Sequence, residues 1–165
     1  MSSRGEVLAE WVGDLRTALE RQLGRTPEAA LHWRAAREMN SIADTVWHIS
    51  RWLDLASSWL ENGAPETQHW IKDGWAERTG YDPRGVGTDG LGVVSGYTFA
   101  EVEAIPKLRG DQLRAYLGAV CEDLIPRLRA ADDATAHRYK SVIQGTFGHL
   151  GEIATLGTLY DRRGG

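Results

Sequence analysis

Two histidines stand within apolar helical runs that lie far apart in the sequence. In "FGHLGEIATLGTLY", Phe147 to Tyr160, His149 falls on the apolar face, and Glu152 follows three residues later. In "DTVWHISRWLD", His48 shares a helical stripe with Thr45, Trp52, Leu55 and Trp59. Imidazole binds zinc, nickel or iron well and titrates near neutral pH, so such residues can hold a metal or move protons. We predict that the two rings face one cavity.

A purely structural explanation competes with each of these roles. A buried imidazole needs a hydrogen-bond partner, and a core histidine can satisfy that need without any ligand. Glu152 can act as a third metal ligand, as an acceptor for an imidazole N–H, or as a solvated group; we predict the acceptor role. Cys121 lies beside an apolar face and is expected to be an inert core thiol. The remaining histidines fall in connections or near helix starts and are predicted to lie on the surface: His32, His69 and His137.

Tryptophan is abundant, with seven residues in a chain of 165. Aromatic weight in one segment indicates either a bulky core or a wall that lines a ligand, and a stripe on a helix is more typical of core. As candidate binding residues we name Thr146 and four tryptophans: Trp52, Trp59, Trp70 and Trp75. The glycines of "GVGTDGLG" do not follow a strand, so a phosphate-binding loop is not expected there.

Length and charge narrow the class of protein. A chain of 165 residues favours a single domain over residues 1–165, with room for a sizeable core. The net charge of −4 and the lack of a basic block make nucleic acid a poor candidate partner. The start "MSSRGEVLAEW" has no apolar signal-peptide core, and no run approaches the ~20 apolar residues of a membrane span. With a single cysteine, these features predict a soluble cytoplasmic protein that does not bind membranes.

Apolar residues spaced three and four apart predict four amphipathic helices. The first should run from about residue 4 to 23, with Ser3 and Glu6 at capping-box spacing and Gly24 closing it. For the second, Asn40 is the predicted cap, and Asn62 and Gly63 should end it.

The third helix should begin near Asp111, and Pro126 is expected to kink or shorten its end. The fourth has the most regular apolar face, formed by Tyr139, Val142, Thr146, His149, Ile153, Leu156 and Tyr160.

A long connection separates the second helix from the third. Residues 63–109 lose regular periodicity, although "PETQHWIKDGWAERTG" and "TFAEVEAI" each suit a short helix. Four amphipathic helices with one such connection predict an all-α four-helix bundle with a long crossover between helices 2 and 3. Because crossovers of this length are often functional, we expect this one to cover one end of the cavity.

Two segments together resemble the DinB/YfiT-like superfamily. "LHWRAAREMNSIADTVWHISRWLD" resembles its entry to helix 2, with the "NSI…H" pattern, and "GTFGHLGEIATLGTL" resembles its last-helix "HxxxHxGE/Q" motif. The order of four helices and the crossover agree as well, so the resemblance covers essentially the whole chain. It implies a divalent metal held by one histidine of helix 2 and two of the last helix, four residues apart. His48 and His149 match two of these positions.

The third position departs from the pattern, because Gly145 stands four residues before His149. Glycine has no side chain to bind a metal. Either Gln144, Thr146, Glu152 or water substitutes in part, or the metal site has decayed and the pocket has another use.

The resemblance implies two kinds of function. One is a small-molecule enzyme, either a transferase or isomerase in which a metal activates mycothiol, bacillithiol or glutathione, or a metal-independent enzyme of secondary metabolism that uses His48 or His149 as acid or base. The alternative is a non-catalytic small-ligand-binding or stress-associated protein with a decayed metal site. A homodimer is compatible with both.

Overall fold

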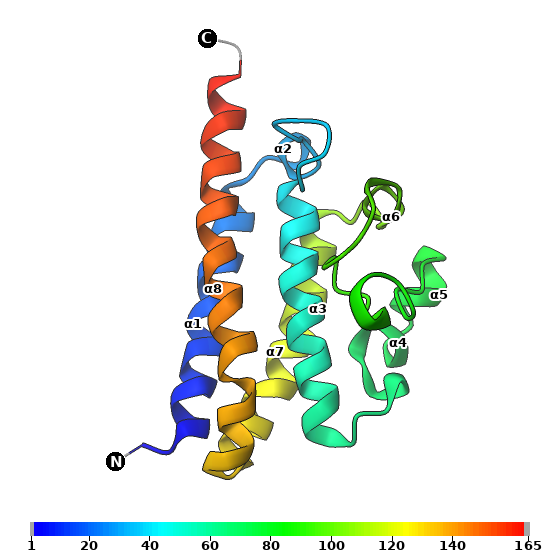
Figure 1. Ribbon diagram of the computed structural model, residues 1–165. Coiled ribbons are helices and arrows are strands. Elements are labelled where there is room, and N and C mark those ends of the chain that lie inside the picture. The colour runs from blue at the N-terminus through cyan, green and yellow to red at the C-terminus, as the bar shows by residue number, and fades with distance from the viewer. Residues whose placement is uncertain (1, 164–165) are drawn as a thin grey trace.

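The computed structural model describes residues 2–163, which form four long helices and a folded crossover beside them (Figure 1). The long helices are α1 (Arg4–Arg25), α3 (Ile42–Glu61), α7 (Gly110–Ala130) and α8 (Asp133–Arg162), with the short α2 (Glu28–Leu31) between the first two. In this part of the chain there is no strand, only an isolated bridge between Val86 and Leu91, and no helix is long and apolar enough to cross a membrane. The all-α four-helix bundle is confirmed.

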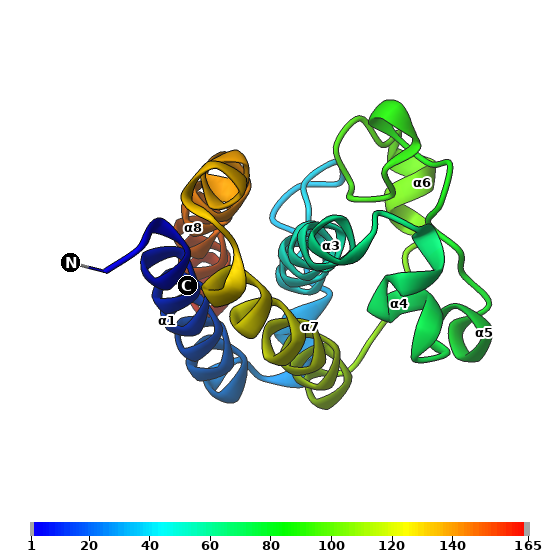
Figure 2. The same cartoon turned by 90° about the horizontal axis from the view of Figure 1, so that it is seen from below.

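The directions of the four long helices explain the long crossover. α1 and α8 run one way, and α3 and α7 run the other way (Figure 1). Seen along its axis, each long helix packs against two neighbours, α1 and α3 both lying between α7 and α8 (Figure 2). Because α3 and α7 are parallel, residues 62–109 have to return along the whole length of the bundle before α7 can begin.

Helix starts follow the capping chemistry of the sequence. Ser3 and Glu6 form the predicted reciprocal capping box of α1. The prediction that Asn40 caps α3 is wrong, because the cap is Ser41. Asp44 stands three residues after Ser41 and completes a capping box with it. The residue three after Asn40 is Ala43, which cannot reciprocate.

Helix ends agree with the sequence less closely. Asn62 ends α3 as predicted, and Gly63 follows with a positive φ of 75°. Gly24 does not close α1, which continues to Arg25. Pro126 does not shorten α7 either, since the helix reaches Ala130. A proline removes one backbone hydrogen bond, and here the buried side chains on both sides of it hold the helix against the core.

The crossover contains five short helical pieces. They are η1 (Pro65–Thr67), α4 (His69–Lys72), α5 (Trp75–Thr79), η2 (Thr88–Gly90) and α6 (Phe99–Glu103). The single helix expected in "PETQHWIKDGWAERTG" is instead three pieces, η1, α4 and α5, and the break between the last two contains Gly74, whose φ of 73° is not helical. The start of α6 is as predicted, because Thr98 and Glu101 form a capping box.

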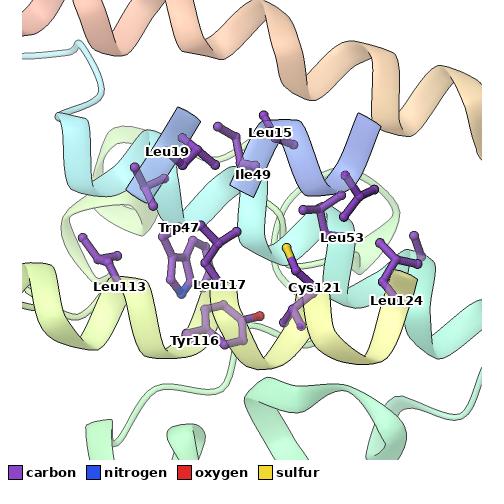
Figure 3. Close-up of a cluster of buried hydrophobic side chains, with 14 of the residues drawn as sticks. Leu15, Leu19, Trp47, Ile49, Leu53, Leu113, Tyr116, Leu117, Cys121 and Leu124 are labelled. Carbon is purple, nitrogen blue, oxygen red and sulfur yellow. The ribbon is translucent and has the colours of Figure 1, made fainter. Parts of the chain in front are cut away.

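The core is built from one apolar face of each long helix. In Figure 3, Leu15 and Leu19 of α1, Ile49 and Leu53 of α3, and Leu117 and Leu124 of α7 converge, and all are fully buried. On α8 the buried positions include Ile143 and Ile153. Val142 and His149 are only partly buried, so the predicted face of α8 is rotated slightly towards a pocket.

Truncating core side chains should be costly. We expect Leu117→Ala or Ile153→Ala to lower the free energy of unfolding by roughly 2–5 kcal/mol, through lost burial and a residual cavity. Urea denaturation measures the effect. Leu159→Ala is the matched control, because Leu159 lies on α8 with 42% of its surface exposed. Core variants as stable as this control would show that the core is misplaced.

Candidate functional site

A pocket of about 450 Å³ lies between α3, α8 and the crossover. α3 and α8 supply most of the residues that line it, and one serine comes from the crossover: His48, Trp52, Ser95, Ser141, Val142, Gly145, Thr146 and His149. Four of the residues predicted to form the site meet here: His48, Trp52, Thr146 and His149. No motif or spacing in the sequence singled out Ser95 or Ser141.

The two histidines are in direct contact. Their Nε2 atoms are 3.1 Å apart, a hydrogen-bond distance, and the rings meet edge to face with centroids 4.7 Å apart. The contact joins helices α3 and α8. The prediction that both rings face one cavity agrees with this geometry.

The Nδ1 atom of each ring bonds to an acceptor. His48 Nδ1 bonds to the backbone carbonyl of Val93, and His149 Nδ1 lies 2.8 Å from a carboxylate oxygen of Glu152. A carbonyl and a carboxylate only accept, so both Nδ1 atoms are assigned as N–H donors. Glu152 therefore lies within reach of an imidazole N–H, and its acceptor role in the site stays a prediction.

These assignments determine the proton count of the pair. Two neutral rings with protonated Nδ1 atoms would point two Nε2 lone pairs at each other across 3.1 Å. The hydrogen bond requires one further proton between them.

Burial distinguishes the two rings. Only 9% of His48 is exposed, and this desolvation lowers the pKa of His48. The neighbouring His149 lowers the pKa further, whereas the Val93 carbonyl and the Glu152 charge raise it. The side chain of His149 is more accessible, at 28% exposure. A charge on His149 therefore disfavours a second charge on His48.

The lowered pKa of His48 predicts a pH-dependent loss of stability. Folding favours neutral His48, so the unfolded chain takes up this proton first as the pH falls below the ordinary value of 6.5. Stability from this group is complete above that value and declines as the pH falls towards the folded-state pKa. We expect His48→Asn to flatten the decline in unfolding free energy as the pH falls from about 6.5 to 5.5. Identical slopes in urea titrations of parent and variant would contradict this.

Several predicted binding residues do not reach the pocket. Trp70 is fully buried, stacks on Trp75 at 5.9 Å, and donates its indole N–H to the Tyr81 carbonyl, so both rings belong to the core beneath the crossover. Trp59 is 38% exposed and touches Trp52 without lining the pocket. Gln144 is exposed on α8 and is not among the residues that line the pocket.

The other candidate side chains do not line this pocket. Cys121 is buried as predicted, and desolvation raises the pKa of its thiol to about 12. His137 is exposed as predicted, and His32 is partly buried against the Leu108 carbonyl. His69 was predicted to be on the surface but is buried, because its ring bonds to Asp73 on one side and to Asp123 of α7 on the other.

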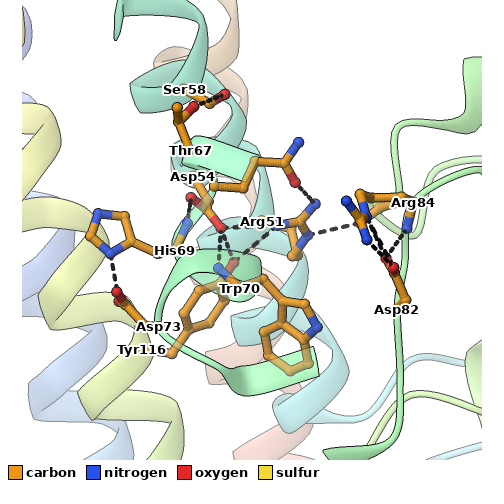
Figure 4. Close-up of polar contacts among 12 residues, drawn as sticks. Arg51, Asp54, Ser58, Thr67, His69, Trp70, Asp73, Asp82, Arg84 and Tyr116 are labelled. Atoms are coloured by element: carbon orange, nitrogen blue, oxygen red, sulfur yellow. Dashed lines mark hydrogen bonds and ion pairs between the residues drawn. The ribbon is translucent and has the colours of Figure 1, made fainter. Parts of the chain in front are cut away.

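A buried polar network lies next to the pocket on α3 and was not expected from the sequence (Figure 4). Arg51 and Asp54 are both fully buried and form an ion pair of 2.9 Å. Asp54 also accepts from the Tyr116 hydroxyl and from the backbone N–H groups of His69 and Trp70. The only signal in the sequence was the spacing of three between two opposite charges on an apolar helix.

The donor set falls short of a catalytic metal site. Within residues 2–163 no group of three or more His, Cys, Asp or Glu side chains is placed to hold a metal ion. Glu152 is engaged with the outer nitrogen of His149, and the remaining donors are two imidazoles, whereas catalytic zinc usually has three protein ligands. At Gly145 a β-carbon would meet nothing within 4 Å, so the missing ligand position is open space.

Comparison with known proteins agrees with this architecture. A family model described as the DinB superfamily matches residues 13–156, a span that reaches from α1 through the crossover into α8 and includes both pocket histidines. No curated protein matches the chain. With four helices in this order, a long crossover, and a histidine of α3 meeting one of α8, the chain belongs to the DinB superfamily.

Proposed function

We propose that this protein is a small-molecule enzyme in which His48 and His149 act together as one acid–base group. The observation that carries the proposal is the Nε2–Nε2 contact of 3.1 Å between rings whose Nδ1 atoms are both already engaged. A pair arranged in this way holds one transferable proton at the surface of a pocket. Imidazole is the side chain best matched to proton transfer near neutral pH.

The number of protons on the histidine pair determines which proton transfers it can carry out. In the singly protonated state, the pair gives its shared proton to a substrate atom that gains negative charge as a bond breaks. It then has two Nε2 lone pairs and takes a proton from an acidic substrate group in the return step. Glu152 and the Val93 carbonyl hold the outer N–H groups throughout, which keeps both Nε2 atoms directed at each other and the pocket.

The lining favours a substrate of mixed character. Trp52 and Val142 offer apolar surface, while Ser95 and Ser141 offer hydroxyl groups. The Thr146 hydroxyl donates to the Ile143 carbonyl at 2.6 Å, so it faces a ligand as an acceptor. We propose a small molecule with an apolar face and several hydrogen-bonding groups.

The reaction class proposed first is thiol transfer or thiol-dependent isomerisation. As the sulfur of mycothiol, bacillithiol or glutathione forms a bond to an electrophilic carbon, the pair would give its shared proton to the leaving group or to the anion formed by addition. The freed Nε2 lone pairs then take the S–H proton of the thiol, which restores the singly protonated pair, so the step needs no oxidant or reductant. An acid–base reaction of secondary metabolism without a thiol uses the same proton transfers.

A divalent metal has a secondary place in the proposal. Zinc, nickel or iron would have His48 and His149 as its only protein ligands, with water completing its shell, so we propose weak binding. When bound, such an ion would supply Lewis-acid activation of a thiol or carbonyl. The proton transfers above need only the two imidazoles. The cytoplasmic location and a homodimer remain predictions.

The test is turnover of thiol and electrophile pairs by protein treated with a chelator, with and without added zinc. We expect activity without metal, and a loss of about 10²–10⁴-fold in His48→Gln and in His149→Gln, the range for general acid–base groups. His137→Gln is the matched control, because His137 is exposed and outside this pocket. Activity that depends on zinc, or that survives both substitutions, contradicts the proposal. Saturable thiol binding without turnover by any pair supports the non-catalytic alternative instead.

A further inference from the structure

We propose that Arg51 and Val94 are positioning residues, which aim the Val93 carbonyl at His48 and so determine which nitrogen of that ring faces the pocket. This inference rests on the proposed acid–base role of the histidine pair. Neither residue lines the pocket, and both act through the backbone of the crossover loop 92–95.

The first step is that two residues of α3 bond to two consecutive residues of the loop. His48 and Arg51 are one turn apart on α3, so their side chains leave the same face. They bond to consecutive carbonyls of the loop: Arg51 Nε donates to the Gly92 carbonyl at 3.0 Å, and His48 Nδ1 bonds to the Val93 carbonyl. Fixing the Gly92 carbonyl therefore restricts the plane of the next peptide group.

The second step is that Arg51 cannot easily move. It is fully buried, and its remaining donors reach Asp54 at 2.9 Å, Gln68 at 2.7 Å and Tyr116 at 3.3 Å (Figure 4). A planar guanidinium with donors engaged on several sides has a fixed orientation. Through Gln68 and Gly92 it ties two distant parts of the crossover to α3.

The third step concerns the other side of the Val93 peptide group. Val94 has a φ of 74°, a left-handed conformation that a β-branched residue rarely adopts. Its side chain is buried against the core, and its carbonyl accepts a hydrogen bond from Tyr97 N at 2.9 Å. Strain of this kind persists only where the surroundings fix the backbone, and it is concentrated at functional sites. Here it turns the chain directly after the carbonyl that His48 needs.

The consequence is a fixed tautomer. While the Val93 carbonyl faces His48, Nδ1 carries the proton and Nε2 presents its lone pair to His149 and the pocket. If that carbonyl turns away, His48 can place its proton on Nε2, and the hydrogen bond with His149 Nε2–H is lost because both atoms would then be donors.

The test is ¹⁵N NMR of the histidine rings in three full-length variants. Val94→Gly removes the buried side chain that anchors the loop and leaves a residue that adopts positive and negative φ about equally, so the 93–94 peptide group is no longer restricted to one orientation. Arg51→Lys keeps a positive charge near Asp54 without the planar donors. Asp89→Gly is the matched control, because Asp89 is the other non-glycine residue with positive φ in the described chain, at 53°, and is exposed.

We expect His48 to be the Nδ1–H tautomer in the parent and in Asp89→Gly, with the Nε2–H form rising from a minor to a major share in Val94→Gly and Arg51→Lys. Unchanged Nδ1–H signals in folded Val94→Gly would overturn the inference, and that variant decides alone if Arg51→Lys does not fold. A tautomer shift together with an inactive parent would refute the proposed function only. Histidine-dependent turnover without any tautomer shift would refute this inference only.

Discussion

The Arg51→Met variant is expected to lose about 3–5 kcal/mol of unfolding free energy, the usual cost of leaving a buried charge without its partner. The partner is Asp54, which is fully buried and 2.9 Å from Arg51. The Tyr116 hydroxyl and two backbone N–H groups would still bond to the carboxylate, but they do not neutralise its charge. The substitution also frees the Gly92 carbonyl and the Gln68 side chain, both buried, from their donor.

Urea denaturation of three variants separates burial from charge. Arg84→Met removes an arginine of similar size from an exposed ion pair with Asp82, so we expect a change of about 0–1 kcal/mol. The double variant Arg51→Met with Asp54→Leu removes both charges and should recover part of the loss. If Arg51→Met proves no less stable than Arg84→Met, the buried network does not hold the crossover to α3 as described.

The Gly145→His variant is expected to bind zinc or nickel at least tenfold more tightly than the parent, a difference of about 1.4 kcal/mol. A histidine there would lie one turn before His149 on the same face of α8. The position lines the pocket, and no atom lies within 4 Å of a β-carbon placed on it, so the imidazole has room. The variant would bring the donor set from two imidazoles to the three that catalytic zinc sites usually have.

Two controls separate metal binding from helix stabilisation, because removing a mid-helix glycine can itself add up to about 1 kcal/mol of stability. Gly148→His makes the same change on α8 at a site that is also open but does not line the pocket. Gly145→His combined with His48→Ala retains the new ring and removes the ligand of α3. Titration with either metal should show tighter binding in the single Gly145→His variant alone. Equal affinity in Gly148→His, or tight binding that survives the loss of His48, would contradict the shared site.

The helices and the meeting of the two histidines could be predicted because both depend on local spacing. Capping boxes marked the starts of α1 and α6, and apolar periodicity placed His48 and His149 on inward faces. Once four helices form a bundle, inward positions on facing helices have few other places to go. The superfamily resemblance and the family match rest on the same residues.

What could not be predicted depends on the path of the crossover. α3 is buried on nearly all sides, because the crossover covers the face that a bundle helix normally exposes. No pattern in the sequence marked Arg51 and Asp54 as buried, and in the structure they form the buried network. The same long-range packing draws Trp70, Trp75 and His69 into the interior. No local pattern encodes which carbonyl of the crossover faces His48.

The central claim is that one proton is shared between His48 and His149, and ¹⁵N NMR of the parent protein near neutral pH tests it most directly. The geometry predicts that both Nδ1 atoms carry protons and that the two Nε2 nuclei, 3.1 Å apart, show scalar coupling across their hydrogen bond. The coupling should disappear in His149→Gln while the Nδ1–H of His48 remains. Two rings without mutual coupling, with either Nδ1 unprotonated, would contradict the shared proton and the acid–base function built on it.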